Sequence, residues 1–544
     1  MARRTFPLIA AVLLALALSV PLAFAEAPAR PGPGPRSEAA TKSEAAKTEA
    51  AKPDRPGAAA AALPADKAEV THHTINAGGR VLAYRATAGV LPVTAEGIPE
   101  ARMFYVSYEL DGADKTRPVA FVFNGGPGAA SAYLQLGAVG PRRLVLNDDG
   151  TVPPPPARFV DNPLTWLAFA DLVFIDPVGT GFSRGVGGKD EKADERAFFG
   201  SKPDIETLAR FIRLYLTRND RWLSPKFLVG ESYGGFRVAA LSNVLQSSYG
   251  VALNGALMIS PVLAFGLSRV DGYQPLPWAL KLPSYAATAL QLGRSSLPKP
   301  AGAVDRKALT EVEAWSLGGY LTALAAGDTL AGPAEQTMLD KVAGYTGLPK
   351  QVIARRHGRI PIGAFAKALL RDQNRVLSLY DGSVSTIDSN PESPNLNDRS
   401  LEMINAALGP AFNAYLRGEL KFETDLPYLV LNEDVSRQWR WSDHSGRQSN
   451  GSALEDLKAG MSFNPRLKVL IAHGLFDLVT PYFASAYAID QLYLDPAVRA
   501  NIALKTYAAG HMIYTHSAAR EALARDAEAF FRDATAPAVP TRMQ

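Results

Sequence analysis

The chain has 544 residues, 47% of them hydrophobic and 20% charged, a balance typical of globular proteins with a large core. Its formal charge of +4 is too small to favour nucleic acid or an anionic membrane as a partner. Cysteine is absent, which excludes disulfides, thiolate metal sites, a lipid-modified cysteine and a cysteine nucleophile.

The first 25 residues are expected to form an export signal peptide. A basic pair at residues 3–4 precedes an apolar stretch over residues 8–20, and the small-x-small ending at residues 23–25 fits a cleavage site. The apolar stretch is short for a membrane span, so we expect no stable membrane insertion after cleavage, with an uncleaved anchor as the alternative. Together with the missing cysteines, this predicts an exported bacterial protein, periplasmic or secreted.

The next segment, residues 26–66, is rich in Ala, Pro, Glu and Lys. It has almost no large apolar side chains, so burial cannot offset the entropy that folding would cost. We therefore predict a linker that takes no part in any chemistry.

The rest of the chain has the pattern of an α/β protein. Residues 70–110 hold β-rich runs separated by glycine and proline, which indicates an opening antiparallel set. Short, dense apolar runs then alternate with helical patterns and suit buried parallel strands. We predict a central, mostly parallel sheet in two parts, residues 67–264 and 454–544. A mainly helical cap, residues 265–453, is expected to be inserted between them.

Residues 230–234, Gly-Glu-Ser-Tyr-Gly, match G-x-S-x-G, the turn that projects a serine hydroxyl between a strand and a helix. The apolar run KFLVG precedes Ser232, and a helical pattern follows it. A second match surrounds Ser183, but it runs into the glycines of GVGG, where starting a helix is costly. Ser232 is therefore the predicted nucleophile, and a structural turn is the alternative.

A serine hydroxyl becomes a good nucleophile when an imidazole takes its proton and a carboxylate orients that imidazole. In α/β enzymes whose serine lies in such a turn, the acid and then the histidine follow the serine in the chain. Asp477 follows the apolar run VLIAHG, and His511 follows the alternating run IALKTY. Both fall in loops at the carboxyl ends of predicted strands, where such sheets place their sites. His516 competes as the base, but it opens the predicted last helix.

Four parts of the sequence together resemble the serine carboxypeptidase family, a branch of the α/β-hydrolases. They are NGGPG at residues 124–128, PVGTGFS at 177–183, GESYGG at 230–235, and the two loops with Asp477 and His511. The combination is more specific than any single motif, and it explains the second G-x-S-x-G match as a family loop without a nucleophile. The resemblance implies an α/β-hydrolase fold with a helical cap, no cofactor, and peptide substrates that lose carboxyl-terminal residues through an acyl-enzyme.

The resemblance also implies a role for each matched residue. Ser232 would be the nucleophile, His511 the general base and then acid, and Asp477 the residue that orients it. The backbone N–H groups of Gly126 and Tyr233 would form the oxyanion hole, which holds the negative oxygen of the tetrahedral intermediate.

Asn124, Gly125 and Glu231 would bind the free carboxylate of the substrate. Glu231 can do this only while protonated, because two carboxylates at hydrogen-bond distance cannot both stay ionised. The sequence departs from the family at two matched positions. Ala129 stands where family members commonly carry a cysteine, and Ala138 stands where a second glutamate would share a hydrogen bond with the first.

Two alternatives to a carboxypeptidase follow from these residues. An esterase or acyltransferase could use the same triad, as Ala138 and the functional breadth of the fold suggest. A catalytically silent binding protein could keep the scaffold, but it would have no physical need for the complete serine, histidine and acid set.

RQWRW at residues 437–441 could stack on a nucleobase, although an ordinary cap segment is favoured. The sequence contains no zinc-protease, phosphate-loop or dinucleotide motif, and it makes no prediction of oligomeric state.

Overall fold

The computed structural model describes most of the chain after residue 65, and these residues belong to one compact unit. The expected signal peptide and nearly all of the expected linker lie outside the described residues. Within the described part of the chain, no helix is both long and apolar enough to cross a membrane. The described ranges are 66–95, 98–186, 195–270, 272–441 and 451–537.

The core is a ten-stranded mixed sheet with the order β1-β2-β3-β7-β4-β9-β10-β13-β14, in which β8 pairs with β3. Strands β1, β2 and β3 pair antiparallel, and every pair from β7 to β14 is parallel. The predicted mostly parallel sheet with an antiparallel start is confirmed. The strands are β1 (Ala68–Ala77), β2 (Arg80–Ala95), β3 (Ile98–Leu110), β4 (Val119–Phe123), β7 (Asp171–Ile175), β8 (Arg184–Gly185), β9 (Lys226–Glu231), β10 (Gly255–Ile259), β13 (Lys468–Gly474) and β14 (Ile502–Tyr507).

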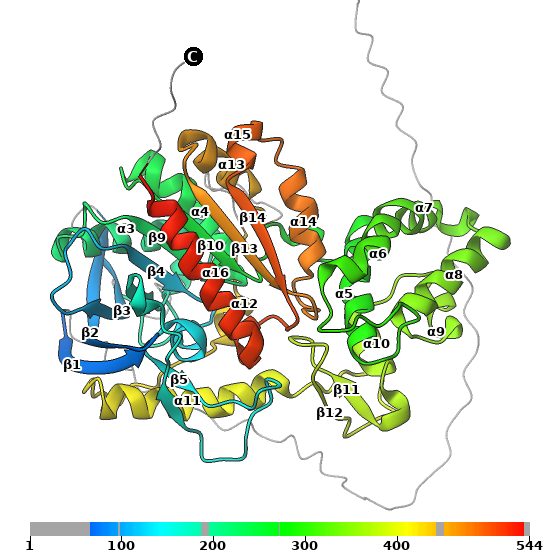
Figure 1. Ribbon diagram of the computed structural model, residues 1–544, viewed down its shortest axis with the longest axis horizontal. Coiled ribbons are helices and arrows are strands. Elements are labelled where there is room, and N and C mark those ends of the chain that lie inside the picture. The colour runs from blue at the N-terminus through cyan, green and yellow to red at the C-terminus, as the bar shows by residue number, and fades with distance from the viewer. Residues whose placement is uncertain (1–65, 96–97, 187–194, 271, 442–450, 538–544) are drawn as a thin grey trace, which may run out of the picture. The chain divides into compact units, whose positions relative to one another are not determined.

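The central strands are apolar on both faces because helices cover both faces. In β4, Phe121 packs into one apolar cluster and Val122 into the other, as the period-2 alternation of a strand requires. Figure 1 shows α16 crossing in front of the central strands, and α16 contacts β10 and β13. On one face lie α3 (Ser201–Arg218), α4 (Tyr233–Ser248) and α13 (Leu454–Phe463); on the other lie α11 (Ser400–Gly418) and α16 (Ser517–Thr535).

The segment between β10 and β13 is mainly helical, as expected for the cap. Helices α5 to α10 form an apolar cluster of their own, which also takes in residues of the loop after β13 and of α14 (Tyr482–Asp490). Figure 1 shows these helices grouped beside α14. The helices are α5 (Leu276–Gln291), α6 (Thr310–Trp315), α7 (Leu321–Ala326), α8 (Pro333–Thr346), α9 (Lys350–Ala354) and α10 (Ile362–Ala368).

Two features of this segment differ from a simple helical cap. It contains a short antiparallel pair, β11 (Arg375–Leu377) and β12 (Ser385–Ile387), which the helical pattern did not predict. Its long helix α11 packs in the main core with α16, so the segment supplies one of the helices that cover a face of the central sheet. The domain boundaries at residues 265 and 453 stay a prediction.

Candidate active site

Ser232 lies in a sharp turn between β9 and α4. Its backbone has φ 61° and ψ −123°, a strained conformation for a residue other than glycine. Its N–H donates to the carbonyl of Ile259 at 2.9 Å, which fastens the turn to the neighbouring strand. A Cβ on Gly230 would lie 2.1 Å from the carbonyl oxygen of Gly234, so only glycine fits where β9 meets α4. The turn thus holds the serine at the carboxyl end of a parallel strand.

Asp477 and His511 come from the loops after β13 and β14, and they form a buried pair. Nδ1 of His511 lies 2.7 Å from Oδ2 of Asp477. The other carboxylate oxygen accepts the backbone N–H groups of Val479 and Thr480, each at 2.9 Å, so the acid is fixed in position. Burial alone would lower the pKa of His511, but the charge and hydrogen bond of Asp477 raise it above its usual value. The histidine is therefore oriented with its Nε2 available for a proton.

Ser232 and His511 line one pocket together with the glycine-rich loop after β4. A Cβ on Gly125 would lie 2.4 Å from the backbone nitrogen of Tyr233, so this loop packs directly on the turn that bears the serine. Gly126 lines the same pocket. The structure thus brings the backbone of both expected oxyanion-hole residues to the serine, and their role stays a prediction.

Glu231 lies beside Ser232 in the chain, and the residue is 2% exposed. Oε2 accepts two hydrogen bonds, from Nδ2 of Asn124 at 2.6 Å and from the hydroxyl of Tyr514 at 2.9 Å. The amide of Asn124 is itself oriented, because its Oδ1 accepts the N–H of Leu134 at 3.0 Å. Burial raises the pKa of Glu231 to about 7, although the charge of His511 and both hydrogen bonds act to lower it. In a substantial fraction of the molecules, Glu231 is therefore protonated near neutral pH.

Residues of the inserted segment hydrogen-bond to the backbone around His511, and the sequence did not predict these contacts. The backbone N–H of His511 donates to the carbonyl of Tyr380 at 2.6 Å, and the N–H of Gly510 donates to Oδ2 of Asp381 at 2.9 Å. His516, the competing base, lies 2.6 Å from that same oxygen of Asp381 through Nε2. No local pattern marks a loop more than 100 residues away in the chain as a neighbour of the histidine.

A second strip of the insertion, residues 428–432, pairs with two of the glycine-rich motifs. The N–H of Gly181 donates to the carbonyl of Leu429 at 2.9 Å, and the N–H of Asn432 donates to the carbonyl of Gly128 at 2.8 Å. A Cβ on Gly128 would lie 2.3 Å from the carbonyl oxygen of Asn432, so the close approach requires glycine. This contact accounts for Gly128 of NGGPG.

The other candidates from the sequence have structural partners. Ser183 is fully buried, and its hydroxyl donates to the carbonyl of Asp176 at 2.7 Å and accepts the N–H of Phe104 at 2.8 Å. Trp439 and Trp441 of the RQWRW segment pack against the ring of Tyr233, with centroids 5.3 and 5.7 Å away. Among the described residues, no group of three or more histidine and acidic side chains could hold a metal ion.

Residues 80–265 match the family described as Serine carboxypeptidase. The chain is 29% identical over 180 residues to "Serine carboxypeptidase S10 family member 1" of Dictyostelium discoideum, covering 32% of this chain and 38% of that protein. It is also 29% identical over 211 residues to "Pheromone-processing carboxypeptidase KEX1" of Puccinia graminis f. sp. tritici, covering 38% and 30%. The chain thus spans about a third of the length of the curated relatives it matches. A bacterial source stays a prediction.

The fold is similar to a solved structure, the prohormone-processing carboxypeptidase Kex1 of Saccharomyces cerevisiae. The TM-score is 0.52 at 16% identity, covering 83% of this chain and 91% of that one. At this identity the similarity shows the fold alone, and it confirms the expected α/β-hydrolase fold.

Proposed function

We propose that the protein is an exported serine carboxypeptidase-like hydrolase, which removes residues from the carboxyl ends of peptides through an acyl-enzyme. The observation that carries this proposal is one pocket with two kinds of group. It is lined by Ser232 and by His511, which is paired with Asp477, and it is also lined by the buried acid Glu231. Ser232, His511 and Asp477 suit acyl transfer, and Glu231 suits recognition of the carboxyl end of a peptide.

In the first half of the reaction, Ser232 attacks the carbonyl carbon of the last peptide bond while Nε2 of His511 takes the hydroxyl proton. Asp477 stabilises the imidazolium that forms. The oxygen that becomes negative accepts hydrogen bonds from the backbone N–H groups of Gly126 and Tyr233. The intermediate then collapses, His511 gives its proton to the leaving amine, and the last residue departs as a free amino acid.

In the second half, a water molecule attacks the ester carbon on Ser232 while His511 removes one of its protons. Collapse of this second intermediate releases the shortened peptide with a new carboxylate, and the proton returns to the serine oxygen.

Recognition of the chain end depends on the protonation of Glu231. A protonated carboxyl group can donate a hydrogen bond to the substrate carboxylate, whereas an ionised one repels it. Since burial raises the pKa of Glu231 to about 7, binding should weaken as the pH rises through that value. His511 must be neutral to accept a proton, so its pKa, which lies above its usual value, sets the opposite limb, on which activity falls as the pH falls.

The experiment uses N-blocked peptides with either free or amidated carboxyl ends, incubated with the wild type and with Ser232→Ala, and analysed by mass spectrometry. Release of terminal residues by the wild type alone, lost on amidation and fading above neutral pH, is the expected result. Equal reaction of amidated peptides or simple esters would favour the esterase or acyltransferase alternative. Failure of a fluorophosphonate to label Ser232 in the folded protein would favour a silent binding protein.

A further inference from the structure

Tyr514 lies three residues after His511, in a single turn of 3₁₀ helix over Ile513–Thr515, and its side chain is 3% exposed. Its hydroxyl donates to Oε2 of Glu231 at 2.9 Å. Asn124 donates to the same oxygen at 2.6 Å. Two donors therefore share one carboxyl oxygen, and neither of these bonds uses Oε1.

The ring of Tyr514 lies over the backbone next to Ala138, where the family resemblance would put a second glutamate. A Cβ on Gly137 would lie only 2.3 Å from this ring, so the tyrosine fills the space beside that segment. The phenol of Tyr514 is thus both a neighbour of the segment that contains Ala138 and a hydrogen-bond donor to Glu231. Gly137 leaves room for the ring, and Ala138 offers no carboxyl group.

We propose that Tyr514 replaces the missing carboxyl partner and determines which oxygen of Glu231 binds the substrate. Oε2 accepts from both donors, so the proton of the neutral acid resides on Oε1, and Oε1–H donates to the carboxylate at the end of the peptide. This inference rests on the proposed carboxypeptidase function. Tyr514 acts through Glu231 and is a positioning residue.

A phenol and a carboxyl group make different partners for Glu231. Two carboxyl groups share a proton and titrate together, whereas burial holds the pKa of Tyr514 well above its usual value, so it stays a donor throughout the working range. Its hydrogen bond favours the ionised form of Glu231. The tyrosine therefore orients the acid without adding a negative charge to the site. The other groups that face Glu231 are Asn124, Tyr133, Tyr380, Asp477 and His511.

The test is Tyr514→Phe, with kcat and KM measured from about pH 4.5 to 9 on a peptide with a free carboxyl end. Loss of one hydrogen bond to the ionised form should move the alkaline limb of kcat/KM upward by about half to one pH unit. Because Glu231 would be less well oriented, KM at low pH should rise by about three- to tenfold, and kcat should stay within about twofold of the wild-type value.

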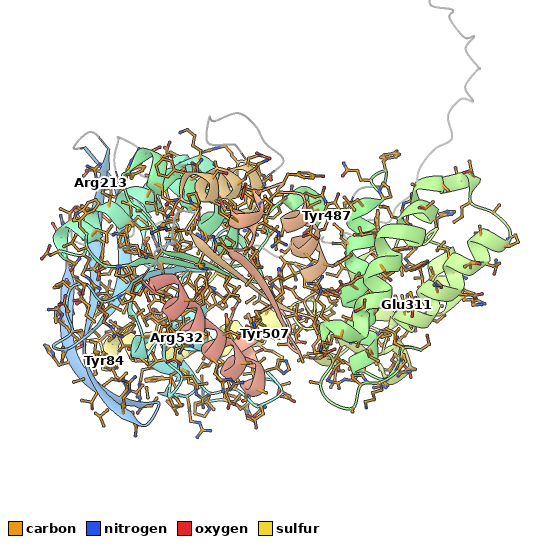
Figure 2. All side chains as sticks on the ribbon, turned by 45° about the horizontal axis from the view of Figure 1, so that its top comes forward. Tyr84, Arg213, Glu311, Tyr487, Tyr507 and Arg532 are labelled. Carbon is orange, nitrogen blue, oxygen red and sulfur yellow. The ribbon has the colours of Figure 1, made fainter. Side chains whose placement is uncertain are left out.

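The matched control is Tyr507→Phe. Tyr507, labelled in Figure 2, donates to a carboxylate in the same way, to Oδ2 of Asp526 at 2.8 Å, but it lies at the end of β14 against α16. This variant should leave the alkaline limb where the wild type has it. If Tyr514→Phe fails to fold, 3-fluorotyrosine at position 514 is a stronger donor, and it should move the limb downward.

The outcomes separate this inference from the proposed function. A wild type that hydrolyses amidated and free peptides equally would refute both. A wild type that prefers the free carboxylate, together with a limb that stays in place in Tyr514→Phe or in the fluorinated protein, would refute only the role of Tyr514. An upward shift in the first variant or a downward shift in the second would support it.

Discussion

Glu231→Gln offers a sharp test of how the site recognises a chain end. Glutamine has nearly the same shape, and its carbonyl oxygen can accept the hydrogen bonds that Asn124 and Tyr514 give to Oε2. Its amide nitrogen can then donate to the substrate carboxylate at every pH, because it does not titrate. The variant should therefore lose the alkaline limb that the wild type shows.

The pKa of Glu231, which burial raises to about 7, sets the size of this effect. At about pH 8.5 only some 3% of Glu231 stays protonated, so the wild type should lose about 30-fold in kcat/KM, whereas the variant should lose none of it for this reason. At about pH 5 the order should reverse, because a carboxylic acid is the stronger donor. The two pH profiles should cross, and parallel profiles would show that another group recognises the carboxylate.

The same substitution also changes stability, and the sign follows from the direction of the shift. Folding raises the pKa of Glu231 from its usual 4.5 to about 7, so a contribution to stability that is complete below about pH 4.5 is lost as the pH rises from there through about 7. At about pH 9 this amounts to roughly 3 kcal/mol, which Glu231→Gln should recover. Urea unfolding of both proteins at about pH 5 and pH 9 measures it, and an equal difference at the two pH values would contradict the reasoning.

Three further substitutions address the catalytic groups. Ser232→Ala should lower kcat by at least about 10³-fold and abolish fluorophosphonate labelling while peptide binding by calorimetry persists; residual labelling would point to another nucleophile. Asp477→Asn should lower kcat by about 10⁴-fold with little change in KM, because the imidazole would be held in the wrong tautomer. Stopped-flow measurement of the acylation rate checks this, and a much smaller loss would show that Asp477 does not set the tautomer. Asp381→Asn should lower kcat by about tenfold through a misplaced His511 loop, and Asp372→Asn, an exposed change, is its control. Burial alone would lower the pKa of His516, but Asp381 raises it, so the effect of Asp381→Asn should shrink as the pH rises and the imidazolium is lost; an effect independent of pH would argue against the ion pair.

The sheet and the serine turn were predictable because their signals are local. The apolar run before Ser232, the glycines around it and the helical pattern after it lie within one short stretch. The order of the strands also limited where an acid and a histidine could reach the serine, since parallel strands end at one edge of the sheet. The expected start of the last helix near Ser517 is confirmed, because α16 begins at that residue.

The contacts that complete the site were not predictable from local pattern. Tyr514 and Glu231 are 283 positions apart, and nothing in the sequence around either residue specifies the other. Asp381 likewise meets Gly510 across 129 positions, from a loop between two strands that the helical pattern concealed. The helical pattern of residues 265–453 predicted helices, but an apolar helix face does not identify the core that it enters, and α11 enters the main one.

Two segments of the insertion, residues 380–381 and 428–432, contact the loops of the candidate site and limit how the insertion can be exchanged. The carbonyl of Tyr380 holds the backbone of His511, and Asn432 pairs with the loop of Gly128. Exchanging the whole inserted segment for that of a relative would remove both supports together with the pocket walls that the insertion supplies. A graft confined to α5 to α10 would keep both segments, together with Tyr380, Leu401 and Leu431, the residues of the insertion that line the pocket.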